Sequence, residues 1–502
     1  MGADNIKIAK NTIYLYIRTI IIMVLSLLST RILLKQLGVD DYGMYNVVAG
    51  IVAMFSSLRG MLASATQRYL NYERKENSID RLRSIFTVSL RLHWIVCFVF
   101  FVVAEIVGLW LLSDKLNIST NQILDAHIVL QCSIITAIVT ILTVPYDAVI
   151  ISNEHFAYYA YFAVLDCVLK LFAACALFVL PSDRVAWYAI IMLVVAVVIR
   201  VINMVYCKKH FEECSGRGNF ERNLAKEMSK FAGWNFLGNT AFAIYNEGIN
   251  LLLNFFGGVV ANAARAVSYQ VLHAAETMCS KLVAAASPQA VHQYALGNRI
   301  HFFDIINISA KLMCLMYLLI AVPVCYFTRD ILTLWLGTVP DYAISFTRMI
   351  LIYGFFRTIH SPLDLCFKAS GKMAKYQIME LFCLTFSVAL AYLFLKNNAP
   401  IESAFLSMII CNVLNLLLMM LLARRQVGFD LSKFGIKVIL PLAIIIISLC
   451  SIIFILSFVL AEYRILFGIV IFVIVLFLEY IIGLTKKERS KFEKLIKLKL
   501  KR

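Results

Sequence analysis

The stretch AIIMLVVAVVI, residues 189–199, is apolar at every position. A transmembrane β-strand alternates apolar and polar residues over about 10 positions, so a continuous run of this kind argues against a β-barrel. An α-helix is then the structure that satisfies its own backbone hydrogen bonds in lipid. Similar runs, such as IVIFVIVLFLEYII at 469–482, recur along the whole chain. The sequence therefore predicts an all-α polytopic membrane protein.

The composition of the 502-residue chain agrees, with 61% hydrophobic and 15% charged residues. Soluble domains average about 45–50% apolar and about 25% charged residues. A spanning helix needs about 20 predominantly apolar residues. On this basis we predict fourteen spans, at 12–34, 43–66, 84–112, 123–146, 157–180, 184–206, 229–254, 259–287, 303–327, 342–366, 376–396, 401–423, 434–460 and 463–484.

The Lys and Arg residues of the connecting loops predict the orientation of these spans. The loops after the second, sixth, tenth and twelfth spans are basic, whereas each odd-numbered loop carries at most a single cation. Because cytoplasmic loops carry an excess of Lys and Arg, we expect both termini to be cytoplasmic. The net charge of +17 comes largely from this asymmetry, and cations spread over membrane-proximal loops make nucleic acid a poor candidate partner.

One segment of the sequence comes back in the second half of the chain. VPYDAVIISNEHFAYY at 144–159 aligns, after a shift of 217, with SPLDLCFKASGKMAKY at 361–376. Pro145 then falls on Pro362, and each proline is followed two residues later by an aspartate. Each proline removes a backbone hydrogen bond and bends or ends its helix. We keep two interpretations open, a hinge between moving lobes and a plain helix-terminating turn.

A second match indicates that the recurrence is an internal duplication. RILLKQLGVDDYG at 31–43 aligns with NLLLNFFGGVVAN at 250–262 after a shift of 219, which places Gly38 on Gly257. Two similar offsets predict two six-helix repeats with the same orientation, hence parallel repeats about an axis along the membrane normal. The predicted organisation is an N-terminal lobe, a cytoplasmic linker, a C-terminal lobe, two extra helices and a basic tail, at 1–206, 207–228, 229–423, 424–485 and 486–502.

These segments resemble a known family. TRILLKQLGVDDYGMYNVVAGI at 30–51, ASATQRYLNYERKE at 63–76 and PLDLCFKASGKMAKYQI at 362–378 are similar to segments of the polysaccharide-export flippases, the Wzx-type members of the MOP superfamily. The residues that carry the first part of the resemblance are Arg31, Leu37, Gly38, Asp40, Asp41, Tyr42, Gly43 and Arg68. Arg59, in LRGML at 58–62, departs from the more neutral turn of many relatives.

The resemblance implies a pair of lobes around a central cavity in a bacterial inner membrane. It implies as substrate an undecaprenyl-diphosphate-linked oligosaccharide, a unit of O-antigen, capsule or exopolysaccharide. This substrate would move from the cytoplasmic to the outer leaflet by alternating access. The expected partners are therefore the lipid-linked oligosaccharide, membrane lipid, a coupling ion (proton or sodium ion) and other polysaccharide assembly proteins. We expect no cofactor, no metal site and no catalytic residue.

Charged residues within the spans are the candidate site residues. An ionisable group at the bilayer centre costs about 2.5–3.5 kcal/mol on insertion scales, so such residues usually face a cavity or a partner. Cations outnumber acids within the spans, and Arg offers phosphate a planar fork of donors. An alternative for Arg31 is that it reaches the outer interface. The candidate substrate-binding cations are Arg18, Arg31, Arg59, Arg265 and Arg357.

Two acids are candidates for ion coupling. Glu247 lies in the middle of a span, in YNEGIN, beside Asn246 and Asn250. Asp166 lies four residues before Lys170, so an ion pair across one helical turn is the alternative to a coupling role. Three isolated histidines, His93, His127 and His360, fit packing or interfacial positions better than a site.

Other functions remain as alternatives. A cation-coupled multidrug exporter of the same superfamily would favour acids over cations within the spans. A membrane glycan polymerase or ligase would need a sizeable outer loop, and neither such a loop nor a catalytic motif is present in the sequence. A fixed channel or scaffold fits a duplicated six-helix lobe less well than rocking motion does. The 13 cysteines are scattered through apolar runs, which is typical of small buried hydrophobes.

Overall fold

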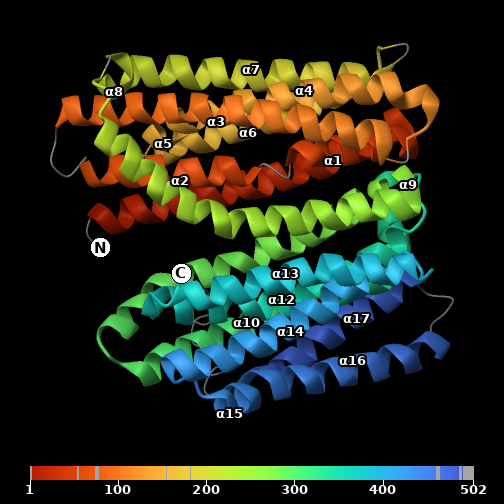
Figure 1. The fold of residues 1–502 in the computed structure, drawn as a ribbon. Helices are drawn as coiled ribbons and strands as arrows, with labels where there is room; N and C mark the ends of the chain where they lie inside the picture. Colours follow the sequence, from red (N-terminus) through yellow and green to blue (C-terminus); the bar gives the residue numbers. More distant parts are fainter. Residues whose placement is uncertain are drawn as a thin grey trace. The chain divides into compact units, whose positions relative to one another are not determined.

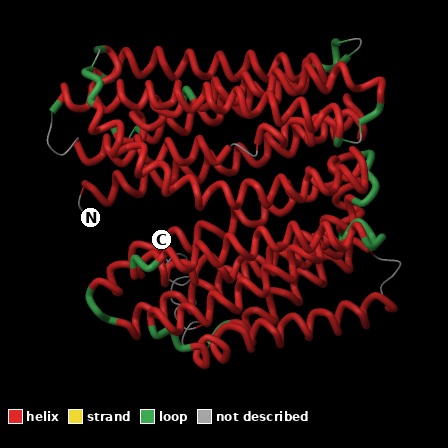
Figure 2. The backbone as a smooth tube through the Cα atoms, in the orientation of Figure 1, coloured by secondary structure: helices red, strands yellow, loops and turns green. Residues whose placement is uncertain are grey.

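The computed structural model describes residues 3–53, 56–73, 78–116, 118–153, 155–180, 183–216, 218–459, 464–485 and 489. Every regular element in these ranges is a helix (Figures 1 and 2), so the predicted all-α class is confirmed. The predicted basic tail at 486–502 lies outside the described residues, apart from Arg489.

The chain forms two compact units. The first contains Met1–Val267, Trp335–Ala343 and Val388–Ala404, and the second contains Ser268–Leu334, Ile344–Ser387 and Phe405–Arg502. Compactness therefore assigns residues 229–267 to the first unit, whereas the repeat pattern assigns them to the predicted C-terminal lobe. The repeat-based lobe boundaries stay a prediction.

The first unit is built from helices that pack mainly against their neighbours in the first repeat. Helix α4 contacts α1, α3 and α7, while α6 packs against both α1 and α7. Trp335 also donates its indole hydrogen bond to the Leu27 carbonyl at 2.8 Å, which ties the 335–343 segment to α1. The helices are α1 Ala3–Ala53, α2 Ser56–Glu73, α3 Ile79–Asp114, α4 Ile123–Ile141, α5 Val144–Ser152, α6 Phe156–Ala176, α7 Arg184–His210, α8 Glu212–Ser215 and α9 Arg222–Ala295, of which the last continues into the second unit.

The second unit packs around α10, whose Phe302 and Tyr317 are fully buried. Helices α16 and α17 both contact α10, so the two helices outside the repeats extend the same hydrophobic core. The helices are α10 Arg299–Tyr326, α11 Thr328–Leu336, α12 Ala343–Ser370, α13 Met373–Lys396, α14 Ser403–Val427, α15 Leu431–Phe434, α16 Leu440–Val459 and α17 Arg464–Leu478, with π-helical turns η2 at Gly435–Ile439 and η3 at Glu479–Gly483.

Ten stretches of the described helices are long and apolar enough to cross a membrane. Helix α1 covers the first predicted span and part of the second, and α9 covers the seventh and eighth, which reduces the number of separate stretches. Helix α12, which contains Arg348, Arg357, Asp364 and Lys368, is not among these ten stretches. The predicted total of fourteen spans therefore stays a prediction.

Two glycines mark equivalent turns in the two repeats. Gly38 interrupts α1 with φ 81°, and Gly258 interrupts α9 with φ 66°. Side chains with a Cβ atom rarely adopt this region, so glycine permits the sharp reversal. The structure thus pairs Gly38 with Gly258, an offset of 220, and the sequence alignment with Gly257 was wrong by one residue.

Polar contacts across these two turns repeat as well. In α1 the Tyr42 hydroxyl is hydrogen-bonded to the Thr30 side chain across the Gly38 turn. In α9 Asn262 donates to the Asn250 side-chain oxygen at 2.8 Å across the Gly258 turn. Thr30 and Asn250 are 220 positions apart in the sequence, and so are Tyr42 and Asn262. The duplication inferred from sequence is therefore visible in the local contacts.

The two equivalent prolines do not have the same local structure. Pro145 is buried in the first turn of α5, directly after the break that follows α4. Pro362 lies inside α12, which continues to Ser370. Pro145 therefore lies at a helix terminus, whereas Pro362 lies in the interior of a helix. A hinge role for either proline stays a prediction.

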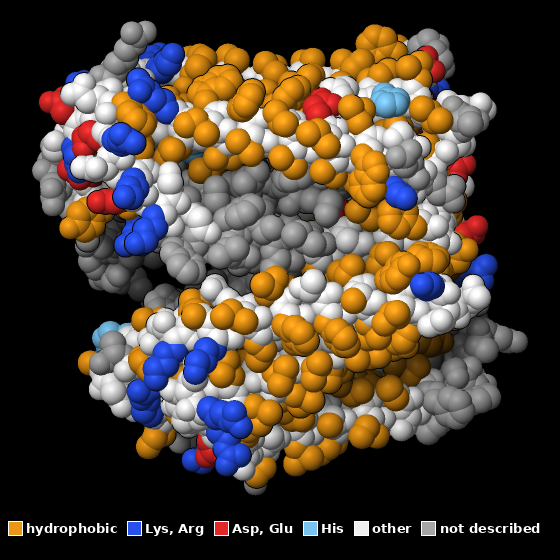
Figure 3. Space-filling view, in the orientation of Figure 1, with side chains coloured by type: hydrophobic (Ala, Val, Ile, Leu, Met, Phe, Trp, Pro, Cys, Tyr) orange, Lys and Arg blue, Asp and Glu red, His pale blue; other side chains and the backbone are white. Residues whose placement is uncertain are grey.

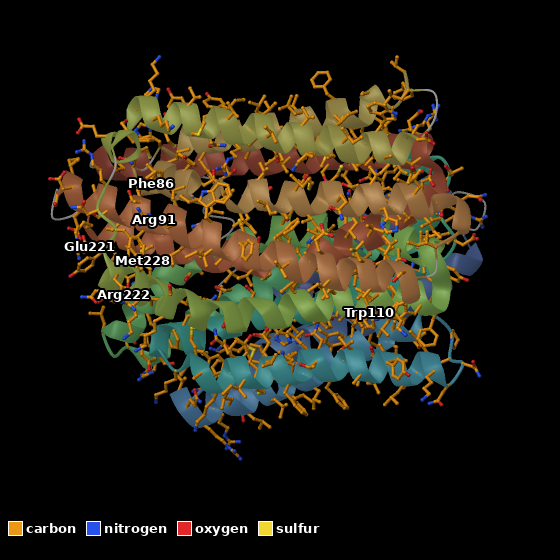
Figure 4. The ribbon with its side chains drawn as sticks, turned by 45° about the horizontal axis from the view of Figure 1, so that its top comes forward. Phe86, Arg91, Trp110, Glu221, Arg222 and Met228 are labelled. Atoms are coloured by element: carbon orange, nitrogen blue, oxygen red, sulfur yellow. The ribbon has the colours of Figure 1, made fainter. Side chains whose placement is uncertain are left out.

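The predicted linker at 207–228 packs closely against α3. Gly218 donates its backbone N–H to the Thr87 hydroxyl at 3.1 Å, and a Cβ atom at Gly218 would overlap the Arg83 carbonyl group. Arg91 lies over the Phe220 ring at 4.7 Å. Figure 4 shows Phe86, Arg91, Glu221, Arg222 and Met228 near one end of the first unit and Trp110 toward the other. This segment therefore fixes the start of α9 on the first repeat.

Basic side chains gather at one end of each unit. In the first unit they lie where the linker meets α3 and in the second near α15, while hydrophobic side chains cover the helix flanks (Figure 3). In the first unit, Arg81 forms ion pairs with Glu221 and Glu73, and Arg83 with Asp80. This distribution agrees with the predicted cytoplasmic side, and the orientation of the termini stays a prediction.

Candidate functional site

The predicted cations do not share one environment. Arg18 lies in α1, but its side chain is outside the part of the chain that the structure describes. Arg31, seven residues before the Gly38 turn, is exposed. Its position fits either of the two predicted roles, a cavity cation or a snorkelling residue. Arg357 belongs to the second unit and the other four cations to the first.

Arg59 forms an ion pair that the sequence did not predict. Its guanidinium lies 3.5 Å from the Asp147 carboxylate, between α2 and α5. Side-chain exposure is 51% for Arg59 and 21% for Asp147. A partly buried acid is therefore paired with an arginine side chain that is half exposed.

Arg265 is nearly buried, with 7% exposure, and is anchored within α9. Its guanidinium donates to the Asn246 carbonyl oxygen at 2.7 Å and to the Asn246 side-chain oxygen at 2.9 Å. It also attracts the Glu247 carboxylate electrostatically. Arg265 is thus held across the Gly258 turn, against the helical segment that carries both partners.

Asn250 connects Glu247 to the rest of this network. Its amide donates to the Glu247 carboxylate at 3.1 Å and to the Asn46 carbonyl of α1 at 3.4 Å. A Cβ atom at Gly50 would lie 2.6 Å from the Asn250 amide nitrogen and 2.7 Å from the Glu247 carboxylate, so a larger residue here would force these side chains to move. We call Asn46, Asn246, Glu247, Asn250 and Arg265 the α1–α9 cluster.

The second unit contains a separate group of charges around Arg357. Arg357 lies 3.6 Å from the Glu276 carboxylate and donates to the Tyr353 hydroxyl at 3.3 Å. It also attracts Glu380, which is hydrogen-bonded to the Tyr376 hydroxyl. We call Glu276, Tyr353, Arg357, Tyr376 and Glu380 the α12–α13 cluster. This cluster contains two carboxylates and one cation, whereas the sequence as a whole has more cations than acids within the predicted spans.

The two predicted coupling acids differ in environment. Asp166 pairs with Lys170 at 2.7 Å, and both side chains are about one-third exposed or more. This is the ion pair across one turn that was the alternative to a coupling role. Glu247 is enclosed by Asn250, Arg265 and α1. The structure therefore favours Glu247 over Asp166 as a candidate for ion coupling.

The two buried histidines have backbone partners. His93 contacts the Ser89 carbonyl through Nδ1 at 2.7 Å, and His360 contacts the Asn412 carbonyl through Nε2 at 3.3 Å. Both are buried, which agrees with packing roles. No group of three or more His, Cys, Asp and Glu side chains within the described ranges is arranged to hold a metal ion.

The sequence profile of the family described as polysaccharide biosynthesis protein matches residues 8–292, more than half of the chain. The chain belongs to this family. The resemblance to polysaccharide proteins that the sequence indicated is thereby confirmed at the level of this family. A comparison with curated proteins gave no match.

Solved structures of MOP transporters share the fold of this polysaccharide biosynthesis family member. The lipid II flippase MurJ in an inward closed conformation aligns with a TM-score of 0.70 at 15% identity, covering 93% of this chain and 98% of that chain. An inward-facing multidrug resistance MATE family transporter of the MOP superfamily aligns with a TM-score of 0.68 at 14% identity, covering 81% and 94%. An outward-facing MATE transporter gives 0.60 at 16% identity, covering 84% and 96%.

The charged side chains of this family member differ in how far they are exposed. The Arg59 side chain is half exposed, and a guanidinium can donate two parallel hydrogen bonds to a phosphate. In the α1–α9 cluster, by contrast, Arg265 is nearly buried and attracts the Glu247 carboxylate electrostatically. Arg357 in the second unit is held by acids in a similar way. Sequence reasoning named Arg59, Arg265 and Arg357, but missed Asp147, Tyr353 and Tyr376.

Proposed function

We propose that the protein is a flippase for an undecaprenyl-diphosphate-linked oligosaccharide. The observation that carries this proposal is its membership of the polysaccharide biosynthesis protein family over residues 8–292. The fold similarity to a lipid II flippase along 93% of the chain supports it. The transport direction would be from the cytoplasmic to the outer leaflet of a bacterial inner membrane, with both termini cytoplasmic.

The diphosphate of such a substrate presents the main energetic difficulty. Its charged oxygens lose hydration when they enter a region of low dielectric, and donors in the protein must replace that water. Arginine is suited to this because its guanidinium stays charged and matches phosphate geometry. Among the described candidates that an acid holds in place, Arg59 has the most exposed side chain, so we assign it the leading role in phosphate binding. Arg31 would assist near the Gly38 turn.

Movement between two states requires an energy source. We propose that a proton or a sodium ion exchanges at Glu247, where a carboxylate lies next to Arg265 in the α1–α9 cluster. The prolines Pro145 and Pro362 would serve as hinges in the same movement. Arg265 and Arg357 would then control the charge of their acidic neighbours rather than bind the substrate directly.

A cation-coupled multidrug exporter is the second candidate. It is favoured by the MATE transporters among the similar structures and by the two acids of the α12–α13 cluster. The match to the polysaccharide biosynthesis family favours the flippase instead.

Deletion of the gene in its source organism separates these functions. A flippase role predicts loss of a surface glycan and accumulation of undecaprenyl-diphosphate-linked oligosaccharide on the cytoplasmic side, both restored by the wild-type gene. The measurement is mass spectrometry of extracted lipids together with glycan staining of intact cells. Normal glycan display with altered tolerance of cationic dyes would favour the drug exporter.

A further inference from the structure

The pairing of Arg59 with Asp147 has properties that a merely structural ion pair does not need. The 3.5 Å separation is longer than the roughly 2.7–2.9 Å that is usual for a charge-assisted hydrogen bond. Half of the Arg59 side chain is exposed, and exposed ion pairs contribute little to stability. The pair therefore holds the guanidinium in place without binding it tightly.

The two partners also differ in freedom of movement. Asp147 lies in the first turn of α5, where its backbone N–H bonds to the Thr143 carbonyl at 3.2 Å and Pro145 restricts the chain. A carboxylate in the first turn of a helix is also favoured by the helix dipole. Arg59 extends from α2 on a long flexible side chain. The acid is thus the fixed member of the pair and the guanidinium the movable one.

The equivalent acid of the second repeat has its ion-pair partner on its own helix. Asp364 is the equivalent of Asp147, and its partner is Lys368 on the same helix, four residues away, at 2.5 Å. That acid is paired within its own turn. Within the residues that the structure describes, Asp147 forms an ion pair with an arginine from a different helix, and Asp364 does not.

We propose that Asp147 is a positioning residue that holds the Arg59 guanidinium while no substrate is bound and competes with the substrate diphosphate for it. This inference rests on the proposed flippase function. On arrival, the diphosphate takes over the guanidinium because it offers more charge and two aligned oxygens. On release, Asp147 recaptures the guanidinium and lowers the cost of freeing the headgroup. The acid thereby limits affinity and favours turnover.

The test is binding of undecaprenyl diphosphate to the full-length protein in nanodiscs. Asp147→Asn removes the competitor, so we expect the Kd to fall on the order of two- to fivefold, the scale of an exposed ion pair. Dissociation should slow correspondingly. Arg59→Ala should raise the Kd, and Asp147→Asn added to Arg59→Ala should change nothing further. Asp147→Glu should return the Kd toward the wild-type value.

The matched control is Asp80→Asn, which removes a carboxylate from Arg83 at the surface of the same unit and should leave the Kd unchanged. A structural role for Asp147 predicts the opposite pattern, with weaker binding in Asp147→Asn whether or not Arg59 is present. That result, or an unchanged Kd, would overturn the inference. If Asp147→Asn does not fold, a Kd for Asp147→Glu equal to that of Arg59→Ala overturns it as well. Absence of binding by the wild-type protein would instead refute the flippase proposal itself.

Discussion

Arg265→Ala is expected to destabilise the protein severely and to stop transport. The substitution leaves the Glu247 carboxylate enclosed without its cation and removes both hydrogen bonds to Asn246. A hydrogen bond from a charged donor is worth about 1.5–3 kcal/mol, so loss of the two bonds to Asn246, together with the lost attraction on Glu247, predicts a large destabilisation. The measurement is the thermal midpoint of the purified protein in detergent, followed by fluorescence-detected size-exclusion chromatography, together with transport in vesicles.

A double variant separates folding from transport. Arg265→Met combined with Glu247→Gln removes both charges and keeps similar volumes, so we expect it to recover most of the lost stability. Transport should remain absent, because the proposed exchange of an ion at Glu247 needs the carboxylate. Full transport by the double variant would show that the α1–α9 cluster is only structural. Equal stability of Arg265→Ala and the wild type would show that Arg265 does not stabilise the α1–α9 cluster.

Gly43→Ala is expected to have the second largest effect, on folding. A Cβ atom at Gly43 would overlap the carbonyl group of Val259, one residue after the Gly258 turn. Overpacking commonly costs about 1–3 kcal/mol, and here the obstacle is backbone that cannot rotate away. Helices α1 and α9 would have to separate, which would also disturb the Asn250 contact with Asn46. The yield of monodisperse protein and its thermal midpoint should both fall.

Gly435→Ala is the matched control for this substitution. Gly435 is also helical, with φ −55°, and a Cβ atom there would meet no atom of the described residues within 4 Å. Alanine at this position should be neutral or slightly stabilising, because it reduces the freedom of the unfolded chain. A loss of stability at Gly435 equal to that at Gly43 would mean that the close approach of α1 to Val259 is not the cause.

The helical membrane fold could be predicted because long apolar runs have few alternatives in lipid. The duplication was also predictable, but its register was not, because Gly257 and Gly258 are consecutive. Gly258 takes the positive φ of the turn, whereas a Cβ atom at Gly257 would overlap the Ile401 side chain. Both positions need glycine for different reasons, and only the structure separates them.

The candidate site was predictable where partners are close in sequence. Asp166 and Lys170 are four residues apart, and the alternative of a pair across one turn follows from helix geometry. Glu247 and Asn250 belong to the same segment and do interact. Arg59 and Asp147 lie on different helices that are far apart in the chain, so no periodicity could connect them.

The central claim, that the protein moves a lipid diphosphate across the membrane, can be tested in proteoliposomes containing the purified protein and undecaprenyl-diphosphate-linked oligosaccharide. A membrane-impermeant oxidant measures how much of the sugar is exposed on the outer surface. We expect the sugar on the inner leaflet to become accessible only when the wild-type protein is present, and much more slowly with Arg59→Ala. The account would be contradicted if the sugar stayed inaccessible in vesicles in which the same protein transports a cationic dye.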